Sequence, residues 1–423
     1  MSPASPSHDR RPPLRVAIVT ESFLPQVNGV TNSVCRVAEH LAAEGHEAVL
    51  LAPGRGPTSY AGFPALRMPA LPLPVYRDFP VGLPYRRAMT AALRAFAPDV
   101  LHLASPALFG AAAVDVARRW ALPTLAVFQT DLPGFAERYR MPGSEALWTL
   151  LRRTHAAVDR TLAPSSATLA ALSDRGFPRI DLWRRGVDTA RFSPEHRSEE
   201  LRRRLAPNGE ALVGYVGRLS REKRVDLLAH LARIPGLRLV VVGDGPERAR
   251  LRRRLPGAVF TGQRTGADLS RLYAALDVFV HTGADETFCQ TVQEALASGV
   301  PVVAPAAGGP VDLVAPERNG LLYAPDSVRE LRVAVGRLAH NREVRARMAA
   351  GARPSVAHRS WASVNAELVE HYRAVIAPSR ELASNARSGA GTRAGANSGA
   401  GTDSGADTGA GADAIPGAGT AHA

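Results

Sequence analysis

The segment ADETFCQTVQEALASGVPVVAP, residues 284–305, carries a clear signal of fold class. Its small and apolar residues predict a helix that Ser298-Gly299 ends, and Pro301 to Ala304 then resembles a buried strand. A helix that leads into a buried strand is typical of an α/β protein with a parallel sheet. Glu286 and Glu294 stand eight positions apart in this segment. Taken alone, they also fit a charge at the helix N-terminus and a solvated surface carboxylate.

Short apolar strands alternate with longer helical runs in two stretches of the chain. The first begins with RVAIVT at Arg15, and the second begins with ALVGYVG near residue 211. A polar segment without periodicity, RRGVDTARFSPEHR, separates the two near Gly186. The pattern predicts two Rossmann-like, doubly wound parallel-sheet domains that face a cleft, where ligands of such sheets bind at the strand ends.

These patterns divide the chain into five parts. The last part is rich in glycine and alanine and has almost no large apolar residues, so it cannot offset the entropy of ordering. We predict a disordered lead over residues 1–13, a first domain over 14–186, a second domain over 187–360, a helix over 361–377 that returns to the first domain, and a disordered tail over 378–423.

Composition excludes several classes of protein. The chain has 423 residues and a net charge of +13, and Lys223 is its only lysine among 52 basic residues. The charge fits either a solvated surface or attraction to anionic lipid or a phosphorylated substrate. We find no nucleic-acid-binding pattern, no transmembrane run and no signal peptide, which predicts a cytoplasmic protein. Two cysteines are too few for a disulfide framework or a thiolate metal site.

Residues of the second domain indicate a ligand with phosphates in its middle. Arg218 and Lys223 bracket a short loop after a strand, where two cations can neutralise a diphosphate leaving group. The free amides at the start of the predicted helix, near residues Thr287, Phe288 and Cys289, favour an anion. Carboxylates accept hydrogen bonds from hydroxyl groups, and two carboxylates eight helical residues apart would span about 12 Å. This spacing fits a nucleotide sugar, with hydroxyl groups at both ends.

Two loops of the first domain are further candidates. Asn28-Gly29 opens the first helix and allows a ligand to approach the backbone closely. The loop is not GxGxxG, which argues against a dinucleotide site. At another strand end, the segment FQTDLPGFAERY places Gln129 and Asp131 toward the cleft. Thr130-Asp131 also fits a simple cap of the following turn.

The motifs NGVTNSV, GRLSREK and ETFCQTVQEALASGVPVVAPAAGGPVDLV together resemble glycosyltransferase family 4, whose members have the GT-B fold. The resemblance covers roughly residues 14–377. It implies that Glu286 contacts the donor sugar, that Glu294 holds the ribose, and that Arg218 and Lys223 bind the donor diphosphate. It also places Gly29 in the glycine-containing loop near the phosphate and the acceptor.

Within the family, ESFLPQVNGV and ETFCQTVQEA most resemble actinobacterial GDP-mannose-dependent α-mannosyltransferases. The resemblance implies retaining transfer of a hexose, with mannose from GDP-mannose favoured, to a lipid-linked or inositol-type acceptor, with no metal or cofactor. Alternatives are a UDP-sugar-dependent enzyme that makes glucosyl- or sulfoquinovosyl-diacylglycerol, and a non-catalytic nucleotide-sugar-binding module. Gln129 stands where many members have histidine, which leaves Asp131 as the nearest charged candidate.

Basic and aromatic residues of the first domain suggest contact with an anionic membrane surface. Arg86-Arg87 follows Tyr85, and Arg152-Arg153 follows Trp148 by a few residues. Arginine near an anionic leaflet contributes about 1 kcal/mol per side chain. We therefore expect a protein peripheral at the inner face of the plasma membrane. The apolar residues around Trp148 fit the core face of a helix equally well.

Overall fold

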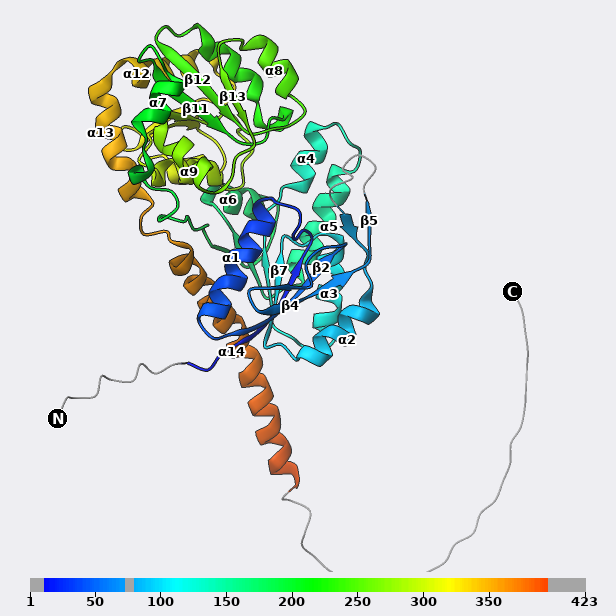
Figure 1. The fold of residues 1–423 in the computed structure, drawn as a ribbon. Coiled ribbons are helices and arrows are strands. Elements are labelled where there is room, and N and C mark those ends of the chain that lie inside the picture. Colours follow the sequence, from blue (N-terminus) through cyan, green and yellow to red (C-terminus); the bar gives the residue numbers. More distant parts are fainter. Residues whose placement is uncertain (1–10, 73–79, 395–423) are drawn as a thin grey trace, which may run out of the picture. The chain divides into compact units, whose positions relative to one another are not determined.

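The computed structural model of the chain describes residues 11–72 and 80–394 (Figure 1). Its first sheet has the order β10-β9-β8-β7-β1-β2-β4-β3 and is parallel except for the β3–β4 pair. The strands are β1 (Arg15–Thr20), β2 (Glu47–Pro53), β3 (Ser59–Tyr60), β4 (Phe63–Met68), β7 (Val100–Ala104), β8 (Thr124–Val127), β9 (Arg160–Ala163) and β10 (Ile180–Leu182). A separate antiparallel pair consists of β5 (Ala70–Pro72) and β6 (Pro80–Gly82).

Helices cover both faces of this first sheet. They are α1 (Gly29–Ala43), α2 (Arg86–Phe96), α3 (Leu108–Arg118), α4 (Leu132–Arg138), α5 (Ser144–Ala156) and α6 (Ser166–Asp174). Alternate residues of a strand point to opposite faces of its sheet. In β1, Val16 and Ile18 pack with side chains of α1, whereas Ala17 and Val19 pack with side chains of α2 and α3. Burial on both faces explains why the strand is almost entirely apolar.

The second sheet is parallel throughout, with the order β13-β12-β11-β14-β15-β16. Its strands are β11 (Ala211–Val216), β12 (Leu237–Val242), β13 (Val259–Gly262), β14 (Val278–Val280), β15 (Val302–Pro305) and β16 (Gly320–Tyr323). Its helical segments are η1 (Pro194–His196), α7 (Glu199–Leu205), η2 (Arg221–Lys223), η3 (Val225–Arg233), α8 (Arg248–Arg254), α9 (Gly266–Ala275), α10 (Gln290–Ala297), α11 (Pro310–Leu313), α12 (Val328–His340), α13 (Arg342–Ala352) and η4 (Arg353–Ser355). The prediction of two doubly wound parallel-sheet domains is confirmed.

The final helix, α14 (Trp361–Ala394), begins against the first sheet. Val364 and Leu368 share a core with Val16 and Ile18, and the Tyr372 hydroxyl lies 2.6 Å from Nδ1 of His102 in β7. Helix α14 therefore belongs, in its first turns, to the same core as β1 and α1.

The structure differs from the sequence prediction after residue 377. The helix continues through Pro378 to Ala394, where we predicted a disordered tail. Proline interrupts the hydrogen bonding of a helix, but alanine, arginine and glutamate in the following residues favour helical backbone, so the helix resumes. Residues 395–423 of the predicted tail and residues 1–10 of the predicted lead lie outside the described residues. Within 11–72 and 80–394, no helix combines the length and apolar character needed to cross a bilayer.

Candidate functional site

An ion pair joins the carboxyl ends of two neighbouring strands of the second sheet. Lys223 lies in η2 after β11, and Glu286 lies in the loop after β14, which pairs with β11. The Lys223 Nζ donates a hydrogen bond of 2.7 Å to Glu286 Oε1. The same oxygen lies 3.2 Å from Nε2 of His281, the first residue after β14. Two residues that are 63 positions apart are thus brought together by the strand order.

The charges at this pair support each other. Burial alone would raise the pKa of Glu286, but the Lys223 ammonium and the contacts with His281 outweigh it and hold that pKa well below its usual range. Burial alone would lower the pKa of Lys223, but the Glu286 carboxylate more than compensates and raises it. Both groups are therefore ionised at neutral pH, with a fixed positive charge and a fixed acceptor at one point.

The loop between β14 and α10 differs from the predicted helix. We expected a helix from just after Glu286, but α10 begins at Gln290, so the estimate of about 12 Å for the carboxylate spacing does not apply. The Gly309 amide donates a 2.7 Å hydrogen bond to the Glu286 carbonyl, which ties the loop to the next turn. A Cβ on Gly308 would lie 2.5 Å from that carbonyl oxygen, so only glycine permits this approach. The tie holds residues 286–289 in an irregular loop instead of a helical turn.

The three predicted donor-binding residues after Glu286 have different surroundings. The Thr287 hydroxyl donates a 3.0 Å hydrogen bond to the backbone carbonyl of Gln129 in the first domain. The Phe288 side chain is 2% exposed and packs in the second-domain core, so it can offer a ligand only its backbone. Cys289 precedes α10 in the left-handed region, with φ of 75°, which is unusual for a residue with a side chain.

Glu294 lies one turn into α10 and is held by a tyrosine. The Tyr273 hydroxyl donates a 3.0 Å hydrogen bond to Glu294 Oε2. Burial raises the pKa of Glu294 to about 7, against the opposing effects of the Tyr273 hydrogen bond and the charges of Arg191 and Arg185. Within the described residues, Glu294 has no ion pair within 4.0 Å. Its carboxyl group is therefore suited to accept or donate a hydrogen bond to hydroxyl groups of a ligand.

Buried Arg185 connects the linker between the domains to both sides of the site. Its guanidinium donates to the Gly29 carbonyl at the start of α1, and burial lowers its pKa to about 10. Its own carbonyl accepts a 3.0 Å hydrogen bond from Gln293 Nε2, while Gln290 Nε2 donates to the Gly186 carbonyl at 3.1 Å. The start of α10 is thereby fixed against the linker.

Asn28 and Asp131, two of the predicted residues in the first domain, cap helices. Asn28 Oδ1 accepts a 3.0 Å hydrogen bond from the Thr31 amide, and Asp131 Oδ1 accepts one of 2.9 Å from the Gly134 amide. The interpretation of Asp131 as the cap of the following turn is confirmed. Burial raises the pKa of Asp131, although the Gly134 amide opposes the increase. These side chains position the loops and have backbone partners already.

The side chain of Gln129, unlike those of Asn28 and Asp131, has no hydrogen-bond partner among the described residues. It is 8% exposed, and neither Nε2 nor Oε1 has a hydrogen-bond partner among the described residues. A buried polar group without a partner costs about 1–3 kcal/mol, so native structures rarely leave one without a reason. The amide lies on the residue whose carbonyl receives the Thr287 hydroxyl. Its amide can offer an acceptor oxygen and two N–H donors to a ligand.

Arg218 is exposed directly after β11, and its carbonyl accepts a 3.1 Å hydrogen bond from the buried Tyr215 hydroxyl. Burial would raise the pKa of nearby Glu222, but hydrogen bonds from Ser220 and Tyr139, with the charge of Arg218, lower it. The bond from Tyr139 also links the first domain to η2. Arg218 therefore adds a second positive charge to the loop that carries Lys223.

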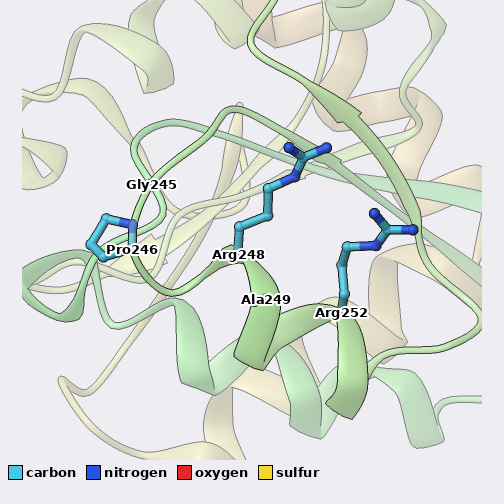
Figure 2. Close-up of a pocket in the computed structure, with 5 residues that line it drawn as sticks. All are labelled: Gly245, Pro246, Arg248, Ala249 and Arg252. Atoms are coloured by element: carbon cyan, nitrogen blue, oxygen red, sulfur yellow. The ribbon is translucent and has the colours of Figure 1, made fainter.

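A surface hollow of about 460 Å³ lies beside this loop, at the start of α8 (Figure 2). Figure 2 shows the Arg248 and Arg252 side chains extending from the helix. Arg248 forms an ion pair of 3.0 Å with Asp244. At the preceding turn, a Cβ added to Gly245 would lie only 2.4 Å from the Leu219 carbonyl oxygen. Gly243 and Gly245 thus serve the turn between β12 and α8. Neither Lys223 nor Glu286 lines this hollow. We therefore place the candidate site at the Lys223–Glu286 ion pair and not at the hollow.

Sequence reasoning missed three residues of the site, His281, Tyr273 and Arg185. The segment DVFVHTG did carry a signal for His281, because a polar residue at the end of a buried strand belongs at the ligand-binding edge of the sheet. In the sequence, Tyr273 cannot be distinguished from an aromatic residue that simply packs a helix into the core. Nothing in the sequence separates Arg185 from the other arginines.

Comparison with known proteins gives concordant matches. The family model described as Glycosyltransferase Family 4 matches residues 27–191, and the model of Glycosyl transferases group 1 matches residues 197–354. The GDP-mannose-dependent alpha-mannosyltransferase of Mycobacterium tuberculosis (strain CDC 1551) is 52% identical over 370 residues, which are 86% of this chain and 97% of the relative. The protein of the same name from Corynebacterium glutamicum is 44% identical, over 88% of this chain and 91% of its own.

More distant proteins share the architecture. Sulfoquinovosyl transferase SQD2 of Arabidopsis thaliana is 32% identical over 86% of this chain and 74% of its own length. Among solved structures, sucrose-phosphate synthase from Thermosynechococcus elongatus superposes with a TM-score of 0.74 at 23% identity, covering 86% of this chain and all of that one. Anabaena Alr3699/HepE in complex with UDP gives a TM-score of 0.71 at 19% identity, over 85% of this chain and all of that one.

Proposed function

Because the chain belongs to glycosyltransferase family 4 and has the GT-B fold, we propose that it transfers mannose from GDP-mannose to a lipid-linked or inositol-type acceptor. Support for this donor comes from relatives of 44–52% identity that are named for GDP-mannose. We further propose that the anomeric configuration of the sugar is retained.

The observation that carries the proposal is the Lys223–Glu286 pair at the ends of β11 and β14. Lys223 and Arg218 would bind the donor diphosphate and stabilise the charge that develops on it as the sugar leaves. Glu286 would accept hydrogen bonds from sugar hydroxyls, and Glu294 would hold the ribose. These cations supply the positive charge that the leaving group needs, so the scheme requires neither a metal ion nor an organic cofactor.

In the proposed reaction, an acceptor hydroxyl oxygen forms a bond to C1 of mannose while the bond from C1 to the β-phosphate oxygen breaks. The acceptor approaches on the face from which the diphosphate leaves, so the configuration at C1 is retained. The acceptor proton passes to an oxygen of the departing diphosphate. Gln129 cannot titrate, so its role is limited to a hydrogen bond with a sugar hydroxyl through its unpaired amide.

A lipid-linked acceptor is supported by exposed apolar side chains on the first domain. Val27 and Leu108 are 76% and 52% exposed, and they lie in the loop after β1 and at the start of α3, which follows the neighbouring strand β7. Because the carboxyl ends of parallel strands meet at one edge of a sheet, these side chains belong to the same edge as Gln129. Such a surface suits an acyl chain beside the reacting hydroxyl.

The predicted membrane contact through Trp148 needs correction. Its ring stacks on Phe128 at 6.4 Å and packs against Phe177, and Leu151 is buried in the same cluster, so this face of α5 forms core. Arg152 and Arg153 on the same helix are exposed, as are Arg86 and Arg87. We propose that these arginines, with the net charge of +13, bring a cytoplasmic protein to the inner face of the plasma membrane.

The test is a donor panel on the purified full-length protein, with GDP-mannose, UDP-glucose, UDP-GlcNAc and UDP-sulfoquinovose. We expect GDP-mannose alone to raise the melting temperature and to be hydrolysed or transferred. Glu286→Ala should abolish the reaction, and Arg221→Ala serves as the control because its side chain is 79% exposed and pairs with Glu247. Preference for a UDP-sugar would favour the second candidate, a diacylglycerol glycosyltransferase, which the 32% identity to SQD2 supports.

A further inference from the structure

We propose that His281, Glu286 and Cys289 form a binding site for a thiophilic divalent cation, with Zn²⁺ as the reference ion, and that occupation of this site blocks the donor. The inhibition rests on the proposed function, whereas the binding of the metal does not. The three residues come from the end of β14 and the loop that precedes α10.

The first argument is the distance between the ligand atoms. One ligand atom from each of His281, Glu286 and Cys289 lies within 4.8 Å of the other two. His281 Nε2 and Glu286 Oε1 are 3.2 Å apart. Zinc bonds of about 2.0–2.3 Å in a tetrahedron place ligand atoms about 3.4–3.7 Å apart. Side-chain movements of about 1 Å would therefore close the cluster around an ion, with water as the fourth ligand.

The second argument is that the histidine has no partner outside the cluster. His281 is 2% exposed, its ring contacts Glu286 and Cys289, and neither ring nitrogen makes a hydrogen bond to any other described residue. Its ring stacks on Tyr215 with centroids 6.5 Å apart, and its carbonyl accepts a 3.1 Å hydrogen bond from Tyr323. The backbone and ring are thus fixed, while a buried nitrogen remains available to a ligand.

The backbone at Cys289 brings the thiol to the same point. A φ of 75° is uncommon for a residue with a Cβ, and Sγ of Cys289 lies within 4.8 Å of a ligand atom of His281 and of Glu286. Thiolate and imidazole together select Zn²⁺ and similar ions over Mg²⁺, which prefers oxygen ligands. Two cysteines are too few for a site built of thiolates alone, but here one thiolate is joined by an imidazole and a carboxylate. The chain has one other cysteine, Cys35, in the core of the first domain.

Binding of the ion is balanced by the loss of protons and by a change at Lys223. The Cys289 thiol releases its proton when the metal–sulfur bond forms. Burial lowers the pKa of His281, but Cys289 and Glu286 outweigh it and raise that pKa to about 10, so the imidazolium also releases a proton before its nitrogen binds the ion. The Glu286 carboxylate exchanges the Lys223 ammonium, now at 2.7 Å, for the cation. A bound ion therefore makes Glu286 unavailable to the donor sugar. It also leaves the Lys223 ammonium and the metal cation close together, so that repulsion weakens the binding of each to Glu286.

The experiment measures binding by a signal that only a cysteine ligand gives. The full-length protein without an affinity tag is titrated with Cd²⁺ or Co²⁺, and thiolate-to-metal charge-transfer absorption is recorded. Zn²⁺ is then added as competitor, and Mg²⁺ as the control ion. We expect one equivalent of the charge-transfer signal, displaced by Zn²⁺ and indifferent to Mg²⁺.

Cys289→Gly is the informative variant, because glycine accepts the positive φ and the loop keeps its backbone. We expect it to lose the signal, and His281→Asn to weaken binding more than about 100-fold, beyond the effect usual for residues that only support a ligand. Cys35→Ser is the matched control and should keep full binding. No signal in the natural protein, or an unchanged signal in Cys289→Gly, would overturn the site.

Competition with GDP-mannose separates this inference from the proposed function. If the donor displaces Cd²⁺, the two share Glu286 and both proposals are supported. If the signal depends on Cys289 but GDP-mannose leaves it unchanged, the metal site holds and the placement of the donor at Glu286 is refuted.

Discussion

Replacing Lys223 with methionine would remove the positive charge next to Glu286 while keeping most of the volume of the side chain. The ammonium lies 2.7 Å from Glu286 Oε1, and the two side chains are 28% and 15% exposed. Losing one charged donor to a leaving anion costs about 10²–10³ in rate. Breaking a well-buried pair costs up to about 3–5 kcal/mol of stability, because the other charge loses its partner. We expect both losses in Lys223→Met.

The double variant Lys223→Met/Glu286→Gln distinguishes these two effects. Glutamine carries no charge, so most of the lost stability should return, while transfer from GDP-mannose stays at or below the rate of Lys223→Met. Unfolding in urea gives the stability, and single-turnover kinetics give the rate. Arg221→Ala is the matched control for both measurements, since its cation is solvated and outside the pair.

The effect of pH follows from the direction of the shift in Glu286. In the natural protein the pKa of Glu286 is depressed, so its contribution to stability is present above the unfolded value of 4.5 and is lost as the pH falls toward the folded value. Without Lys223, burial and the remaining His281 contacts oppose each other and the pKa of Glu286 rises from its depressed value, so the variant's deficit should shrink as the pH falls below 4.5. Natural turnover in Lys223→Met, or a deficit independent of both pH and Glu286→Gln, would refute the reasoning.

Four further outcomes test other parts of the molecule. Glu294→Gln should be more stable than the natural protein above pH 7 and equal to it below about 4.5, because the pKa of Glu294 is raised to about 7 and its ionisation destabilises the fold; melting temperatures at pH 5 and 8 measure this. Gln129→Leu should keep or gain about 1 kcal/mol of stability and lose transfer activity, since it removes an unpaired buried amide; an active variant would contradict its contact with sugar. Truncation after Ser379 should leave the melting temperature unchanged, because the last core residue of α14 is Ile376; a drop of several degrees would contradict this. Arg86→Glu with Arg87→Glu should reduce sedimentation with anionic vesicles in low salt, and equal binding to neutral vesicles would argue against an electrostatic contact.

The family, the enzyme class and the architecture could be predicted from the sequence, and the comparisons confirm them. The architecture was predictable because buried parallel strands and helices have strong periodic patterns. The family was predictable because the motif that contains Glu286 and Glu294 is more specific than charges on a solvated helix surface. Arg218 and Lys223 were found because the chain has a single lysine, which stands at a strand end.

Features that depend on packing between distant segments were not predictable. Helix α10 begins at Gln290, later than predicted, because the Gly309 amide binds the Glu286 carbonyl and Gly308 packs closely against it. These glycines are distant from Glu286 in the sequence. The left-handed backbone at Cys289 and the buried guanidinium of Arg185 likewise follow from contacts with other elements. The inward face of Trp148 depends on Phe128 and Phe177, which no local pattern near α5 indicates.

The proposed roles of Lys223 and Glu286 offer a reason why lysine, and not arginine, stands at position 223. An ammonium has three donors around one small centre, so it can bind Glu286 with one and leave two for a diphosphate. A guanidinium is planar and wider, and its paired donors would bind both carboxylate oxygens in one plane. That arrangement would take Glu286 fully and leave it unavailable to a sugar hydroxyl. Since 52 basic residues include one lysine, its position against Glu286 supports the proposal that this loop binds the donor diphosphate.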